Sequence, residues 1–198
     1  QSGKHGWGEA EEIRRADYGL APRLYFATSG VNHSHPTETI KSLCDRRVLK
    51  LMKGLTSAQR AEPGVYPLVT TSEELKSSKG YDFEGEAICI PLVSSTGHGH
   101  ASIKRLTYIE GKFAAATITS VLQVVDKETF HPRFLYYYLQ AHKDDLLVPL
   151  MRGAANVSLT LGKIGTVRVP LLTLDEQHQM ISALDDIDNK ITQTRDTL

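Results

Sequence analysis

Side chains that form hydrogen bonds gather in one segment of this sequence, residues 93–105. They are Ser94, Ser95, Thr96, His98 and His100, followed by Lys104 and Arg105. Hydroxyls and imidazoles donate and accept hydrogen bonds at the edges of DNA bases, and the two cations suit phosphate or guanine. The pattern predicts a loop that reads bases, with an ordinary flexible surface loop as the alternative.

A second segment with similar chemistry, residues 152–156, reads Arg-Gly-Ala-Ala-Asn. Arg152 can pair with guanine and Asn156 with adenine through two hydrogen bonds each, which suits this segment to reading base edges. The alternative is a helix terminus with a structural asparagine. We expect Lys104, Lys112 and Lys163 to bind the DNA phosphates beside the two segments.

No pattern in the sequence predicts catalysis. The Gly-x-Ser-x-Gly sequence of a nucleophile elbow is absent, and Gly97-x-Gly99 lacks the further residues of a dinucleotide or phosphate loop. His33-Ser34-His35 and His98-Gly99-His100 have no adjoining carboxylate or cysteine to complete a metal site. The Asn-Pro-Pro-Tyr or Asp-Pro-Pro-Tyr sequence that amino-methyltransferases use on a flipped base is also missing. We therefore expect no catalytic and no metal-binding residues, and a protein that is not an enzyme.

Charge is distributed unevenly along the chain, although the formal net charge is zero. Residues 173–198 carry six acidic side chains against two basic ones, whereas residues 87–109 and 146–174 carry no acidic side chain. Acid-free basic segments approach phosphates without repulsion. The distribution is therefore compatible with a nucleic-acid partner for the body of the chain, and the alternative is the basic patch that is common on ordinary soluble domains.

The composition is that of a folded chain with its own core. Of 198 residues, 40% are hydrophobic and 23% are charged, which suits one or two soluble domains. No run approaches the roughly 18 apolar residues that span a bilayer, and no secretion signal opens the chain, so we expect no membrane contact and a cytoplasmic location. Cys44 and Cys89 lie in apolar patterns without CxxC spacing and are expected to be buried free thiols.

Apolar periodicity predicts a mixture of helices and strands. Helical spacing covers residues 36–53 and the stretch after Pro132, while runs rich in β-branched residues cover 64–72, 86–90, 117–125 and 164–169. Consecutive helical residues do not share a face, so we expect most of Tyr136-Tyr137-Tyr138 to pack on the body. The expected fold class is α+β, a mixed sheet domain with packed helices, followed by a C-terminal coiled-coil-forming spacer helix.

Six residues of the last predicted helix, which opens with Asp175 and Glu176, repeat at heptad spacing. They are Met180, Leu184, Ile187, Ile191, Thr194 and Leu198. Alternating spacings of four and three are typical of a coiled-coil seam and predict pairing with a second copy of the chain as a homodimer. The alternative is an amphipathic helix packed on its own domain.

The succession of several short motifs resembles that of type I restriction-modification specificity subunits. The motifs are Gly64-Val65-Tyr66-Pro67, Glu84-Gly85-Glu86-Ala87-Ile88, Gly111-Lys112-Phe113, Phe134-Leu135-Tyr136-Tyr137-Tyr138-Leu139, Gly153-Ala154-Ala155, Val169-Pro170-Leu171 and Glu176-Gln177. Each motif is weak alone, but their order is specific, and the resemblance covers roughly residues 60–198.

The resemblance implies a target-recognition domain at residues 61–172, which reads one half of a bipartite DNA target, and a spacer and dimerisation helix at 173–198. It implies as partners double-stranded DNA, a methyltransferase subunit and a restriction subunit in a prokaryotic cytoplasm. S-adenosylmethionine, ATP and Mg would be bound by those subunits and not by this chain. Family members have two recognition domains, so this chain would be a half-subunit that pairs with itself. Residues 1–60 are expected to form a partly helical extension whose role the resemblance does not define.

Two other functions stay open at this point. A protein-interaction adaptor would act through the final helix alone, with basic segments that are incidental. The recognition end of a single-chain methyltransferase-nuclease would have its catalytic part upstream of Gln1, and the residues before Gly64 would be the tail of that part.

Overall fold

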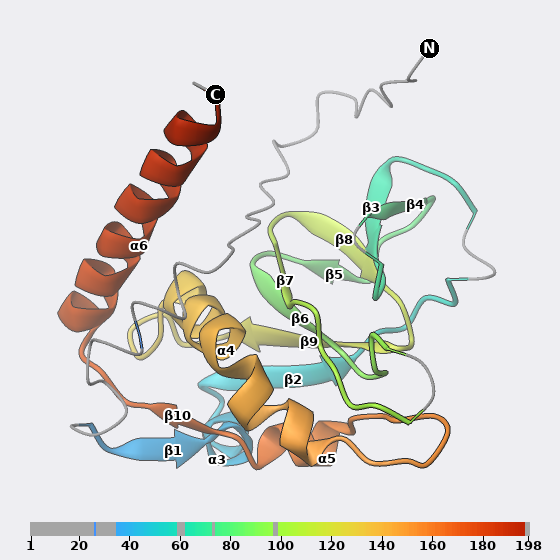
Figure 1. The fold of residues 1–198 in the computed structure, drawn as a ribbon, viewed down its shortest axis with the longest axis horizontal. Helices are drawn as coiled ribbons and strands as arrows, with labels where there is room; N and C mark the ends of the chain where they lie inside the picture. The colour runs from blue at the N-terminus through green and yellow to red at the C-terminus, as the bar shows by residue number, and fades with distance from the viewer. Residues whose placement is uncertain (1–25, 27–34, 59–61, 73, 97–98, 197–198) are drawn as a thin grey trace.

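The computed structural model describes Phe26 and residues 35–58, 62–72, 74–96 and 99–196, with residues 187–196 described by their backbone alone. The strands are β1 (Thr37–Thr39), β2 (Leu49–Lys53), β3 (Tyr66–Val69), β4 (Lys76–Ser78), β5 (Phe83–Glu84), β6 (Ala87–Pro91), β7 (Thr107–Ile109), β8 (Lys112–Ala115), β9 (Thr119–Val124) and β10 (Arg168–Pro170). The helices are α3 (Ile40–Asp45), α4 (Pro132–Leu146), the short 3-10 helix η1 (Val148–Leu150), α5 (Leu161–Gly165) and α6 (Leu174–Asp196). This mixture confirms the expected α+β class (Figure 1).

Two four-stranded sheets form the body of the fold. The first has the order β2-β9-β6-β7, with antiparallel neighbours throughout. The second has the order β4-β3-β8-β5, in which β3 and β8 run parallel and the other pairs antiparallel. Phe113 of β8 and Cys89 of β6 belong to one buried cluster, so the two sheets share a core.

Strand β6 is buried on both faces. Ile88 and Ile90 join the core on the side of the helices, whereas Ala87 and Cys89 join the core between the sheets. Side chains alternate between the faces of a strand, so a strand covered on both sides needs a continuous apolar sequence. Burial raises the pKa of the Cys89 thiol, which is free, as is the half-buried Cys44.

Helix α4 covers the other face of the first sheet. His131 caps its first turn by accepting a hydrogen bond from the backbone N–H of Arg133, and Pro132 occupies the first position. Because α4 contacts β6 as well as η1 and α6, all three residues of Tyr136-Tyr137-Tyr138 are buried. The expectation that these tyrosines pack on the body is confirmed.

The helix expected over residues 36–53 is wrong for most of its length. Only Ile40–Asp45 is helical, Arg47 turns the chain with a φ of 61°, and Leu49–Lys53 forms an edge strand of the first sheet. Apolar residues in so short a run fit either periodicity, and pairing with β9 decides for the strand. In the same way, residues 164–165 end α5, and the strand expected over 164–169 is confined to Arg168–Pro170.

Residues 37–53 belong to the same body as the expected recognition domain. Strand β1 pairs with β10, β2 pairs with β9, and α3 contacts α5. The extension expected at 1–60 therefore includes part of this body. Residues 1–25 and 27–34 lie outside the described part of the chain.

The first half of α6 packs on its own chain, while the helix extends away from the sheets (Figure 1). Leu184 is fully buried and Met180 packs against the same core. Asp185 accepts hydrogen bonds from Arg133 of α4 at 2.5 Å and from the Tyr137 hydroxyl at 2.7 Å. The prediction that Leu184 lies in a seam for a second copy is corrected, because its side chain is fully buried in the core of this chain. Met180 is half-buried against the same core, and its place in a seam stays a prediction. The side chains of Ile187, Ile191, Thr194 and Leu198 lie outside the described residues.

Candidate nucleic-acid interface

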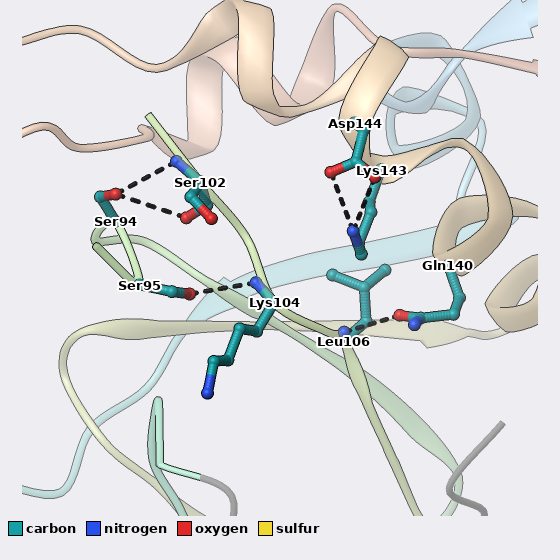
Figure 2. Close-up of polar contacts among 8 residues, drawn as sticks. All are labelled: Ser94, Ser95, Ser102, Lys104, Leu106, Gln140, Lys143 and Asp144. Atoms are coloured by element: carbon teal, nitrogen blue, oxygen red, sulfur yellow. Dashed lines mark hydrogen bonds and ion pairs between the residues drawn. The ribbon is translucent and has the colours of Figure 1, made fainter. Parts of the chain in front are cut away.

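The loop that joins β6 to β7, residues 93–105, is organised around Ser94. The Ser94 hydroxyl donates to the His100 carbonyl at 2.5 Å and accepts from the backbone N–H of Thr96 at 3.3 Å. It also accepts from the backbone N–H of Ser102 at 3.1 Å (Figure 2). The hydroxyl of Thr96 also donates to the His100 carbonyl, at 3.2 Å. These hydroxyls hold the shape of the loop. Base contact by Ser94 stays a prediction, and it requires these bonds to rearrange.

The far end of this loop is tied to its start and to helix α4. The Ser95 hydroxyl accepts a hydrogen bond of 3.1 Å from the backbone N–H of Lys104, and Gln140 of α4 accepts one of 2.8 Å from that of Leu106. Figure 2 shows the exposed Lys104 side chain pointing away from α4. Gln140 was not predicted, because a helical glutamine carries no sequence signal for holding a distant loop.

The cationic and imidazole side chains of this loop are exposed to different degrees. Lys104 and His100 are exposed and Arg105 is half-buried. His98 lies outside the described residues. Lys104 and Arg105 therefore bring positive charge to a surface whose backbone is fixed by the bonds described above.

The second predicted segment, residues 152–156, lies beside the first. Val93 forms an antiparallel bridge with Ser158, and the backbone N–H of Ser94 donates to the Val157 carbonyl at 3.0 Å. A Cβ on Gly99, which has a φ of +81°, would stand 2.6 Å from the carbonyl oxygen of Ala154. The structure thus brings the two segments, more than forty residues apart in sequence, into one surface.

Arg152 and Asn156 are exposed at the two ends of their turn. Gly153 makes this turn possible, because a Cβ there would lie 2.2 Å from the Asn156 carbonyl oxygen, at a φ of +137°. The Arg152 Nη1 donates to the carbonyls of Pro149 at 2.7 Å and Met151 at 2.8 Å, which holds the guanidinium on the backbone. The Nε and Nη2 groups take no part in these two bonds.

The two remaining predicted phosphate anchors differ in position. Lys163 is exposed on α5, which begins at the Thr160 cap just after the second segment. Lys112 begins β8 and lies over the ring of Tyr81, 5.2 Å from its centroid. Since Ala87 stands opposite Ile109 in the antiparallel pair of β6 and β7, Lys112 follows the end of this pair that is remote from the 93–105 loop. Lys112 is thus not brought together with the other predicted residues.

A third pair of segments adjoins this surface, and the sequence analysis did not predict it. The backbone N–H of Gly54 donates to the Thr119 carbonyl at 2.8 Å, and that of Leu92 donates to the Ile118 carbonyl at 2.8 Å. The end of β2 and the turn before β9 therefore continue the surface from the 93–105 loop. The available signal was charge, because residues 46–61 contain five basic and no acidic side chains.

A metal-binding cluster and a membrane-spanning helix are both absent from the described residues. No cluster of three or more histidine, cysteine, aspartate or glutamate side chains in this part of the chain is arranged to hold a metal ion. Among the helices described here, none combines the length and the apolar character needed to cross a membrane.

The α+β body carries a basic loop surface that is rich in hydrogen-bonding side chains. The family model of the type I restriction modification DNA specificity domain matches residues 39–198. The chain belongs to this family.

Solved structures share the fold. The S subunit of a type I restriction-modification system from M. genitalium is similar with a TM-score of 0.62 at 17% identity, over 82% of this chain and 41% of that chain. A structure reported for the complex assembly and conformational transition of the type I R-M system gives 0.61 at 13% identity, over 90% and 46%. The HsdS subunit from Thermoanaerobacter tengcongensis gives 0.58 at 13% identity, over 88% and 45%. The chain thus spans less than half the length of each of these structures. No curated protein matches the sequence.

Proposed function

We propose that this chain reads one half of a bipartite duplex DNA target through the surface made by residues 93–105 and 152–156. The observation that carries the proposal is the backbone pairing beside these two segments, one of which contains Lys104 and Arg105 and the other Arg152. Both segments lie in stretches without acidic residues, so the phosphate backbone approaches this face without repulsion. Lys104 and Lys163 bind phosphates, and Arg152 and Asn156 read base edges.

The chain directs catalysis and does not perform it. In this proposal a methyltransferase subunit and a restriction subunit dock on the specificity chain and carry S-adenosylmethionine, ATP and Mg. Two copies associate through the C-terminal half of α6, giving two identical readers and a palindromic, interrupted target. Support comes from the heptad spacing of Ile187, Ile191, Thr194 and Leu198, which continues beyond the buried Leu184.

Selection from a random duplex library tests the proposal. The full chain, alone and with its methyltransferase subunit, is expected to enrich a defined sequence. The selected duplex then serves to compare the double variant Lys104→Ala/Arg105→Ala with a control, Lys76→Ala/Lys79→Ala, which removes the same charge from the region of β4. The first pair should reduce the slope of log affinity against log salt by roughly two units if both side chains contact phosphate, and the control should not change it.

Two results would contradict the proposal. Equal salt slopes for the two variants would show that the 93–105 loop is not part of the DNA surface. Enrichment of no sequence at low salt, even with the methyltransferase subunit present, would favour an adaptor that acts through α6.

A further inference from the structure

Two aliphatic side chains beside the 93–105 loop are exposed. Leu55 is 66% exposed and Ile118 is 38% exposed. Leu55 follows the end of β2, and Ile118 stands just before β9. Exposed aliphatic residues are ordinary when they are scattered singly, so their meaning depends on where they lie.

Leu55 and Ile118 lie on two segments that are bonded to each other. The Gly54 N–H donates to the Thr119 carbonyl at 2.8 Å, and the Thr117 N–H donates to the Thr56 carbonyl at 3.1 Å. The residues on either side of Leu55 thus form hydrogen bonds with the residues on either side of Ile118. The backbones of the two residues are therefore held side by side, and Leu55 and Ile118 together are termed the aliphatic patch.

This patch continues directly into the proposed DNA surface. The Leu92 N–H donates to the Ile118 carbonyl at 2.8 Å, and the Leu159 N–H donates to the Leu92 carbonyl at 2.8 Å. Backbone hydrogen bonds thus link residues 54–56 to residues 117–119. They continue from Ile118 to Leu92, just before the 93–105 loop, and from Leu92 to Leu159, just after residues 152–156. Figure 1 shows these segments at the end of the first sheet where β2 ends and β9 begins.

The charge around the patch suits a polyanion. The segments that meet here belong to stretches of the described chain without an acidic residue, which are 46–58, 87–96, 99–109, 111–125 and 146–174. One carboxylate reaches the border, because Asp82 accepts a hydrogen bond of 2.5 Å from the Thr56 hydroxyl.

We infer that Leu55 and Ile118 are specificity residues that contact thymine methyl groups in the major groove, beside the bases read by the 93–105 loop. This inference rests on the proposed function. The C5-methyl of thymine is the apolar group that a base pair presents in the major groove, and aliphatic side chains recognise it by contact. Replacement of this methyl by hydrogen, as in uracil, removes the contact and leaves the hydrogen-bonding edge of the base unchanged.

A docking surface for a protein subunit fits these observations less well. Stable protein interfaces bury about 20–30 residues on each side around an apolar centre. Here two aliphatic side chains adjoin a basic, hydrogen-bonding surface. A pair of this size suits methyl contact within a polar groove.

The test uses the duplex that the full chain, together with its methyltransferase subunit, enriches from a random library. Each thymine of that duplex is replaced in turn by deoxyuridine, and the affinity of the wild-type complex is measured. At least one replacement is expected to weaken binding by about fourfold, the effect of one buried methyl-sized group. The double variant Leu55→Ser/Ile118→Ser should bind the thymine and uracil duplexes equally.

A matched control removes two other exposed aliphatic side chains. Val65, 68% exposed, precedes β3, and Val125, 56% exposed, stands at the opposite end of β9 from Ile118. The variant Val65→Ser/Val125→Ser should keep the full thymine preference. Thermal unfolding of both variants verifies that each one folds.

Several results overturn the inference while leaving the proposed function in place. They are a selected sequence without thymine, equal binding of thymine and uracil duplexes by the wild type, and a thymine preference that survives in Leu55→Ser/Ile118→Ser. Loss of methyltransferase binding by this variant with unchanged thymine preference would assign the patch to a protein contact. Enrichment of no sequence by the wild type would instead contradict the proposed function itself.

Discussion

The side chain of Gln177 accepts, through Oε1, a hydrogen bond of 2.7 Å from the backbone N–H of His131. Its Nε2 donates to the carbonyls of Thr129 at 2.9 Å and Leu172 at 3.0 Å. These bonds join the first turn of α6 to the start of α4, and the Gln177 side chain that makes them is fully buried. The direction in which α6 leaves the body is therefore fixed by three hydrogen bonds in a dry site.

Replacement of Gln177 by Leu should destabilise the protein by about 3 kcal/mol, because it leaves one buried backbone N–H and two carbonyls without this partner. The control is Gln179→Leu, two residues along the same helix at an exposed position. Chemical denaturation of both variants measures the difference. Equal losses of stability would show that the Gln177 amide does not hold the helix.

Sequence reasoning found the start of α6 but not the role of Gln177. Acidic residues at a helix N-terminus and a heptad pattern are local signals, and both are visible in residues 175–191. The partners of Gln177 lie up to 48 residues away and use backbone atoms, which leave no trace in side-chain type. The burial of Leu184 agrees with the alternative of a helix packed on its own domain, which the sequence left open because a heptad pattern does not identify the surface that it packs on.

The two segments of the proposed DNA surface were predicted from the sequence. The adjoining segments at the end of β2 and before β9 were not. Residues 93–105 and 152–156 were identified by side-chain chemistry, and their contact depends on the antiparallel bridge between Val93 and Ser158. The roles of Ser94 and Ser95 differ from those expected, because hydroxyls in a tight loop bond to the nearest backbone groups. The end of β2 was assigned to a helix, and the basic, acid-free composition of residues 46–61 was the signal that could have placed it beside the loop.

A methyl group at Gly99 should separate the two reading segments. In Gly99→Ala the new Cβ meets the Ala154 carbonyl oxygen at 2.6 Å, and the residue must also keep a φ of +81°. Such strain costs about 1–3 kcal/mol and is relieved by movement of the loop, so affinity for the selected duplex should fall about tenfold or more. The control is Gly80→Ala, whose Cβ would meet nothing within 4 Å. Unchanged affinity in Gly99→Ala would show that DNA binding does not need the two segments in contact.

The protein should lose stability as the pH falls below about 6.5 because of His131. Burial and the neighbouring ring of His178, whose centroid lies 5.3 Å away, hold the pKa of His131 below its ordinary value of 6.5. Arg133 and Lys127 act in the same direction, and Glu86 opposes them. The folded state thus favours the neutral imidazole, and the unfolded chain binds more protons as the pH falls. The stability that is present above pH 6.5 is therefore lost as the pH falls through the pKa of His131 in the folded state.

Thermal unfolding between about pH 8 and about pH 5.5, a range that begins above the ordinary pKa of histidine and ends about one unit below it, measures this effect. Asn is a good N-cap residue and does not titrate, so His131→Asn should preserve the cap of α4 and flatten the pH dependence. Glu86 titrates in a lower window, because hydrogen bonds from Lys127 and Tyr108 outweigh burial and hold the pKa of its carboxyl below 4.5. A slope in His131→Asn as steep as that of the wild type would assign the pH dependence to another group.

Self-association through α6 should depend on the part of the helix beyond Leu184. Leu184 is fully buried in its own core, so its replacement would damage the fold and could not report on a dimer. Ile191 continues the heptad pattern, and an aspartate there would place a charge in the seam between two copies. We expect the wild type to sediment as a dimer and Ile191→Asp as a monomer. Thr192→Asp, which adds the same charge one residue outside the seam, should stay dimeric. A monomeric wild type, or a dimer that survives Ile191→Asp, would exclude the heptad seam as the basis of pairing, and two readers would then have to be brought together by the methyltransferase subunits.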